Sequence, residues 1–163
     1  KSGPVAFSTA ALVQHVGYDN GAEDDASMGF AVFGSAKFSV TDTVSIQGNV
    51  NYTDGANGYL WRSGTNYYGE DAYVDANGSV ETITGYSANI GTSIKTGPGT
   101  LNVVYGFTTM DWDDAIDDGL AVGNKHETNT NAFVNYQWSP LETVMMAMQT
   151  ALCSRRNITS NQI

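Results

Sequence analysis

Apolar and polar residues alternate with a period of two along most of this chain. In Val44–Thr53 the even-numbered positions are apolar or glycine, and the odd-numbered positions are Ser, Gln, Asn, Asn and Thr. Thr82–Ile94 and Met28–Val40 repeat the pattern, with Phe33 as the exception on the polar side of the second segment. Because side chains of a β-strand point alternately to opposite faces, each segment predicts a strand with one apolar and one polar face.

Four further segments complete a set of about seven predicted strands. Leu101–Thr109 and Asn131–Trp138 alternate in the same way. Val5–Tyr18 is less regular, and we expect Leu12, Val16 and Tyr18 on its apolar face despite Gln14 between them. Thr143–Leu152 contains a continuous apolar run, so its periodicity also fits a helix, although the neighbouring strands favour a strand.

The connections between these strands alternate in length. Short turns are expected at 41–43, 96–100 and 139–142, and long loops at Asp19–Ser27, Asp54–Val80 and Asp111–Lys125. Transmembrane barrels have short periplasmic turns and longer extracellular loops, whereas a soluble sandwich has no reason to separate the two kinds. The fold predicted is therefore all-β, part of an antiparallel up-and-down transmembrane β-barrel.

The distribution of charged and aromatic side chains agrees with this fold. Of the 17 acidic residues, all except Asp42 and Glu142 lie in or beside the long loops, and the strand centres carry none. A carboxylate facing hydrocarbon is costly, so this separation is expected of a membrane wall. Aromatic residues are expected on the apolar face, mostly near strand ends, as in interfacial girdles: Tyr18, Phe30, Phe38, Tyr52, Tyr86, Tyr105, Phe107, Tyr136 and Trp138. In a soluble sandwich the same rings would form the core.

Composition excludes several other classes of protein. No window approaches the roughly 18 to 20 apolar residues of a membrane helix, so a helical span is excluded. With 7 Lys and Arg against 17 Asp and Glu, the net charge of −10 argues against nucleic-acid binding. The single Cys153 cannot form an intrachain disulfide. Lys1–Phe7 has no signal-peptide pattern, so we expect a mature or internal fragment.

Three stretches resemble the trimeric porins of Gram-negative outer membranes, most closely the DcaP-like group. They are Gly48–Tyr52 before a long loop, Val80–Ser87 at the return strand, and Asn135–Glu142 at a late turn. The resemblance covers roughly residues 5–148 and implies a 16-stranded barrel in a homotrimer, with this chain as its C-terminal portion. It also implies an outer-membrane location, with membrane lipid and lipopolysaccharide as neighbours.

The chain departs from the DcaP-like pattern at two places. Asp54–Leu60 lacks the Arg-Tyr step that members tend to have after the glycines, which puts the inherited solute selectivity in doubt. Cys153–Ile163 is polar and basic, without a closing strand that ends in an aromatic residue. We therefore predict a partial barrel over 1–152 and an atypical tail over 153–163, interpreted as truncated or foreign sequence.

The function predicted is passive diffusion of small hydrophilic solutes through a wet channel. Hydroxyl and amide side chains on the polar face can line such a channel without binding a solute tightly. The predicted pore-lining residues are Ser35, Lys37, Ser45, Gln47, Asn49, Asn51, Arg62, Ser87, Asn89, Lys95, Asn131, Asn135 and Gln137. Lys37, Lys95 and, if the long loop folds inward, Arg62 would favour anions such as dicarboxylates. Alternatively, the two lysines extend to the membrane surface from strand ends near the periplasm.

No catalytic set is apparent, and no enzyme, cofactor or metal is predicted. His15 and His126 have no ligands at suitable spacing. The acidic run from Asp111 to Asp118 does not have the spacing of an EF-hand and is interpreted as a solvated loop, with divalent bridging to lipopolysaccharide as a secondary hypothesis. Two other classes stay open: a soluble extracellular β-sandwich or adhesin-like module, and a β-rich enzyme.

Overall fold

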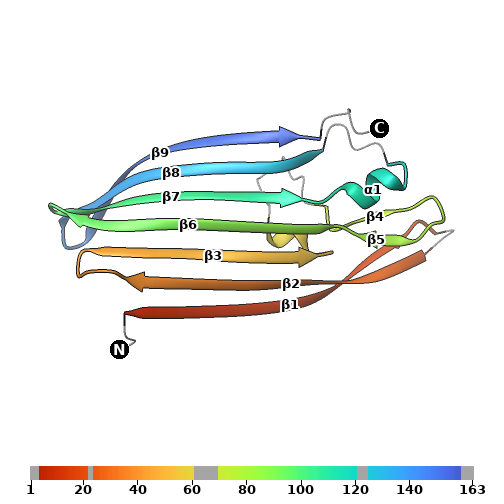
Figure 1. Cartoon of the computed structure of the whole chain (residues 1–163), viewed down its shortest axis with the longest axis horizontal. Helices are drawn as coiled ribbons and strands as arrows, with labels where there is room; N and C mark the ends of the chain where they lie inside the picture. The colour runs from red at the N-terminus through yellow and green to blue at the C-terminus, as the bar shows by residue number, and fades with distance from the viewer. Residues whose placement is uncertain (1–3, 22–23, 61–69, 121–124, 159–163) are drawn as a thin grey trace.

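The computed structural model is dominated by one antiparallel sheet of seven strands (Figure 1). It describes residues 4–21, 24–60, 70–120 and 125–158. The order across the sheet follows the order along the chain, apart from a small hairpin inserted in one loop. The strands are β1 (Val5–Asp19), β2 (Asp24–Ser39), β3 (Val44–Asp54), β6 (Thr84–Thr96), β7 (Gly99–Met110), β8 (His126–Leu141) and β9 (Val144–Asn157).

The predicted all-β, up-and-down arrangement is confirmed, and all seven expected segments are strands. The segment that also fitted a helix, Thr143–Leu152, lies in β9. The prediction of a long first loop at Asp19–Ser27 is wrong, because β1 extends to Asp19 and β2 already begins at Asp24. Backbone pairing continues there through polar residues, with Tyr18 opposite Asp25, since a strand needs no apolar face once it extends beyond an apolar band.

Pairing registers divide the sheet into two faces. One register row runs through Phe38, Ile46, Thr92, Val103 and Val134, and defines the apolar face. Register rows of the other kind alternate with these, and one of them defines the polar face by running through Ser35, Asn49, Asn89, Gly106 and Asn131. A slip of one residue in any pair would mix the two sets, so the alternation in the sequence fixes the register.

Strand β1 has the opposite orientation to the one expected. Its Val13 pairs with Phe30 and therefore lies on the apolar face with Phe7, whereas Leu12 pairs with Ala31 on the polar face. Gln14, Val16 and Tyr18 share the face of Leu12, so Tyr18 is not part of the apolar face. The prediction of Leu12, Val16 and Tyr18 as apolar-face residues is wrong. It assigned the apolar face to the side of β1 with these apolar residues, whereas the pairing with β2 places that side on the polar face.

The short turns and the long loops lie at opposite ends of the sheet, here the turn end and the loop end. The loop end carries the small structures: η1 (Asn57–Tyr59), the hairpin of β4 (Ala72–Val74) and β5 (Val80–Thr82), and the helix α1 (Asp113–Asp117) (Figure 1). Five of its buried apolar side chains form one cluster, called the loop-end cluster: Tyr73, Ile83, Met110, Trp112 and Ala115. The seven-stranded sheet thus has packed apolar side chains at one end and open faces elsewhere.

Strand β9 continues past Leu152 through Cys153–Asn157, so pairing extends into the first residues of the predicted tail. The division into a barrel portion and a truncated or foreign tail stays a prediction. Within the described residues, no helix has both the length and the apolar character needed to cross a bilayer.

Candidate functional site

The apolar face leaves large hydrophobic side chains uncovered. Phe7 is 73% exposed, Val50 64%, Ile90 59% and Tyr105 53%, and each lies on this face by register. Soluble proteins rarely expose a contiguous apolar area this wide without covering it. The face therefore requires an apolar environment.

Aromatic side chains contact one another toward both ends of the apolar face. At the turn end, Phe7 meets Phe38 edge-on with ring centroids 6.2 Å apart. At the loop end, Phe30 lies 5.9 Å from Tyr52. Phe30 and Phe38 both lie on β2, about 27 Å apart along the strand at 3.4 Å per residue. With the roughly 40° tilt of barrel strands, this becomes a height of about 21 Å, close to the roughly 25 Å apolar band of outer-membrane barrels.

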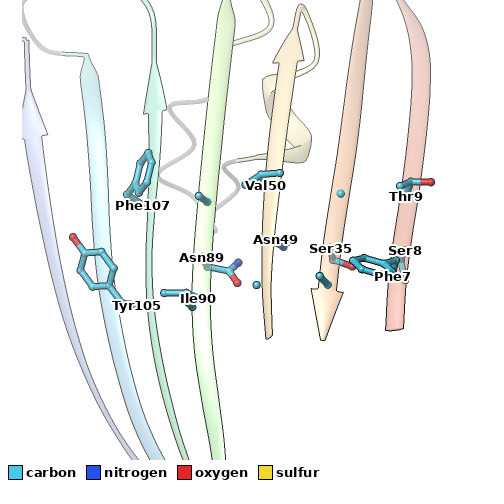
Figure 2. A pocket seen from close by; sticks show the side chains of 14 residues that line it. Phe7, Ser8, Thr9, Ser35, Asn49, Val50, Asn89, Ile90, Tyr105 and Phe107 are labelled. Carbon is cyan, nitrogen blue, oxygen red and sulfur yellow. The ribbon is translucent and has the colours of Figure 1, made fainter. Parts of the chain in front are cut away.

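The middle of the apolar face is hollowed where small residues replace large ones. The hollow has a volume of about 680 Å³, and Gly34, Ala36 and Ala88 contribute to its lining. Figure 2 shows the rings of Phe7, Tyr105 and Phe107 around it, with Val50 and Ile90 between them. The side chains that point to this face are apolar except for Thr9, so the hollow suits hydrocarbon rather than a polar ligand.

The polar face carries a ladder of uncharged hydrogen-bonding side chains. The Ser93 hydroxyl donates to Asn102 Oδ1 at 2.6 Å, and Asn102 Nδ2 donates to Asn135 Oδ1 at 2.8 Å. Nearer the loop end, Asn51 Nδ2 donates to the Ser87 hydroxyl at 2.7 Å. These contacts join strands across the sheet and hold the polar side chains in defined positions.

All the predicted pore-lining residues that the structure describes lie on the polar face. Lys37 and Lys95 are exposed toward the turn end, and Lys95 Nζ donates to the Asp42 carbonyl at 3.1 Å. Arg62 lies outside the described residues. The register therefore brings the predicted set to one surface, and their role as channel lining stays a prediction.

The loop between β3 and β6 folds over the polar face at the loop end. Gln14 on β1 donates to the Gly55 carbonyl at 2.6 Å and to Asp71 Oδ2 at 3.1 Å. Asp71 also accepts from the Gly58 backbone N–H at 3.0 Å. Gln14, an irregularity in the sequence pattern, is thus the side chain by which β1 holds this loop.

A buried polar pair fixes the start of the same loop. Thr53 and Asn57 are fully buried, and the Thr53 hydroxyl donates to Asn57 Oδ1 at 2.6 Å. Asn57 Nδ2 donates to the carbonyls of Ile83, at 2.6 Å, and Glu70, at 2.9 Å. A side chain at Gly85 would collide with Asn57 and Leu60. Sequence reasoning missed this anchor, because nothing local to Thr53 or Asn57 indicates contacts across the loop.

Electrostatic contacts stabilise the loop end. The Tyr73 hydroxyl donates to Asp118 Oδ2 at 2.6 Å. Burial, followed by this hydrogen bond, raises the pKa of Tyr73 above its ordinary value of 10.0. Backbone N–H donation from Ser79 and the side-chain hydrogen bond of Asn77 lower the pKa of Asp75. Lys125 forms an ion pair with Glu70, and Arg156 forms one with Glu127.

The acidic residues of the third loop are the candidates for the calcium interpretation. Among the residues that the structure describes, no group of three or more His, Cys, Asp or Glu side chains could hold a metal ion. That part of the chain includes Asp111, Asp113, Asp114, Asp117 and Asp118, and His15 lies apart from them on β1. The calcium interpretation therefore has no support from the geometry.

Comparison with solved structures places this sheet in a known architecture. The chain superimposes on the crystal structure of the outer membrane channel DcaP of Acinetobacter baumannii with a TM-score of 0.72. It has the fold of part of this channel. The match covers 94% of this chain and 42% of the DcaP chain at 18% sequence identity, so this chain spans less than half of that protein. No protein-family model and no curated protein sequence matches. The resemblance to DcaP-like porins predicted from the sequence is confirmed at the level of the fold.

Proposed function

We propose that this chain is part of the wall of an outer-membrane diffusion channel for small hydrophilic solutes. One observation carries the proposal: the same seven strands present a wide uncovered apolar face and an opposite face of uncharged amides and hydroxyls. In a membrane barrel, the first face contacts lipid and the second contacts water.

The fraction of DcaP that is matched supports a size for the proposed complete barrel. Seven strands over 42% of that chain scale to about 16 to 17 strands, and bacterial single-chain barrels have an even number. This supports the proposed 16-stranded barrel. A homotrimer surrounded by membrane lipid and lipopolysaccharide is proposed with it, on the resemblance alone.

The edge strands support the proposal that the wall belongs to a larger closed structure. Strands β1 and β9 each have one partner in the sheet, so the outer edge of each carries unpaired backbone groups. Such an edge is unfavourable in hydrocarbon, and closing the sheet into a barrel pairs these backbone groups. We therefore expect these seven strands to insert only as part of a complete barrel.

A preference for anionic solutes such as dicarboxylates is proposed from Lys37 and Lys95, which place positive charge on the polar face toward the turn end. Fixed charge in a narrow aqueous path biases which ions pass. A reversal potential measured across a salt gradient reports this bias directly, and neutralising both lysines should shift it toward cations.

Reconstitution of the complete protein tests the proposed function. We expect the protein to require detergent for extraction, and to produce stepwise, voltage-independent conductance in planar bilayers. A soluble β-sandwich or adhesin-like module would remain in solution without detergent and would add no conductance. That result would exclude the channel.

A further inference from the structure

Phe33 is a large apolar side chain on the polar face, where its neighbours along β2 are small or hydrophilic. It pairs with Asn51 on β3 and Ala10 on β1, and it is partly exposed. Contact with lipid does not explain it, because its side chain points away from the apolar face. Its ring therefore faces the polar side of the sheet, as that of Phe133 on β8 also does, and what sets Phe33 apart is the hollow beside it.

A hollow of about 250 Å³ lies beside Phe33 between β1, β2 and β3. The polar-face side chains that line it are Phe33, Ala10, Ser8, Ser35, Asn49 and Asn51. None of the lining residues is charged. The hollow thus combines one aromatic ring with two hydroxyls and two amides.

The hydrogen bonds around the hollow leave acceptor capacity for a ligand. Asn51 uses its Nδ2 to donate to Ser87 at 2.7 Å. Asn49 Oδ1 is buried and accepts no hydrogen bond from any group in the described part of the chain. An unsatisfied buried acceptor is unusual in a protein and calls for an explanation. Because this oxygen has no exposed surface, the Asn49 amide must turn toward the hollow before a ligand hydroxyl can donate to it.

We propose that this hollow is a weak contact site for a neutral, ring-shaped, polyhydroxylated solute such as a monosaccharide. The proposal rests on the channel function above and names one solute class for it. The apolar C–H face of a sugar ring packs on the face of Phe33, while its hydroxyls reach the Asn and Ser side chains. Pockets for drug-sized ligands have volumes of about 300–1,000 Å³, so this smaller hollow suits a single ring.

Weak contact is what a conducting channel requires. A solute must enter readily and leave readily, so a tight site would block transport. Lys37 lies on the same face of β2 beyond Ser35 but does not line the hollow. A charged solute held at Lys37 would therefore occupy a different site, and the experiment separates the two sites.

The test uses the complete protein in planar bilayers, with D-glucose titrated into the bath and ionic current recorded. We expect glucose to reduce the current with a defined half-saturation concentration. Phe33→Leu keeps apolar volume but removes the ring, and should raise that concentration about 2- to 12-fold, the range expected for loss of one aromatic contact. Phe33→Tyr should retain the wild-type value. Phe133→Leu is the matched control, because Phe133 lies on the polar face of β8 away from the hollow.

Four results would overturn the proposal. Ion conductance without any glucose effect removes the solute site and leaves the channel function intact. An unchanged half-saturation concentration in Phe33→Leu removes Phe33 from the site. Stronger inhibition by succinate than by glucose, abolished in Lys37→Gln, assigns the contact to an anion instead. Absence of conductance in every form would contradict the proposed function itself, and the solute site with it.

Discussion

Replacing Ile90 with arginine places a charge in the middle of the apolar face. Ile90 lies on β6 midway between Tyr86 and Ile94, and is 59% exposed. Its neighbours in the register row are Gly48 and Tyr105. If this face contacts lipid, the position is near the middle of the bilayer, where arginine has no aqueous surface within easy reach.

The expected cost has two parts. Arginine at the midplane of a barrel costs about 2–4 kcal/mol. Loss of the contact between the isoleucine side chain and lipid lowers the stability by about 1–2 kcal/mol more. This value is the transfer free energy of a whole isoleucine side chain multiplied by the exposed fraction of Ile90. The total of about 3–6 kcal/mol lowers the folding equilibrium at least about a hundredfold, since 1.4 kcal/mol is a factor of ten.

Asn89→Arg is the matched control, because Asn89 precedes Ile90 on the same strand and points to the polar face. Its side chain is exposed, and Gly106 opposite leaves space for a longer one. We expect a stability change within about 0.5 kcal/mol, as for ordinary surface substitutions. The added positive charge should alter ion selectivity instead.

Equilibrium denaturant unfolding of the complete protein in lipid vesicles, followed by tryptophan fluorescence, measures both variants. The expected result is a much lower midpoint for Ile90→Arg and a nearly unchanged midpoint for Asn89→Arg. Equal tolerance of arginine at both positions in vesicles would refute the assignment of the two faces.

Three further predictions concern the loop end. Gly85→Ala should loosen the loop between β3 and β6, because the added Cβ collides with Asn57 and Leu60. Faster proteolysis of that loop, with the size of the conductance steps unchanged, would show this, and Gly34→Ala is the control, because the atom nearest to its added Cβ is Val50 Cγ2 at 3.8 Å. The raised pKa of Tyr73 means that the folded loop favours the protonated phenol, so its contribution to stability is complete below pH 10 and is lost as the pH rises further. Tyr73→Phe should remove this pH dependence and lower the stability by about 1.5–3 kcal/mol, because the hydrogen bond from Tyr73 to the Asp118 carboxylate is lost. The lowered pKa of Asp75 acts in the opposite direction: its contribution to stability is complete above about pH 4 and is lost as the pH falls further. Protection of the Asn77 and Ser79 amides against hydrogen exchange, taken relative to the intrinsic rate at each pH, should therefore fall in that range in the wild type and be low throughout in Asp75→Ala.

The strands were predictable where burial is one-sided and the alternation complete. In β3 every apolar-face position from Val44 to Tyr52 is apolar or glycine, so only one register satisfies the pattern. In β1 the pattern is ambiguous, and the partner strand decides: Val13 lies opposite Phe30, which leaves Gln14 free to bind the loop. Local sequence cannot contain that information, because the deciding residues lie on another strand.

The placement of the long loop was less predictable than the strands. Its contacts join residues far apart in sequence, such as Gln14 with Asp71 and Tyr73 with Asp118. The length of the loop shows only that it is able to fold inward, whereas the fully buried Thr53 and Asn57 show where it begins to do so. The prediction of a long first loop was wrong for a different reason. Polar composition shows that a segment is in contact with water, but it does not distinguish a loop from a strand that continues into water.

A nitroxide scan along β6 in lipid vesicles tests the central claim most directly. Single cysteines introduced from Tyr86 to Ile94, with Cys153→Ser to remove the native thiol, carry the label. We predict that even-numbered positions contact oxygen dissolved in the lipid, and odd-numbered positions contact a water-soluble nickel chelate, with a period of two. Equal exclusion of both probes from the even-numbered positions would mean that protein covers this face, and would contradict the account.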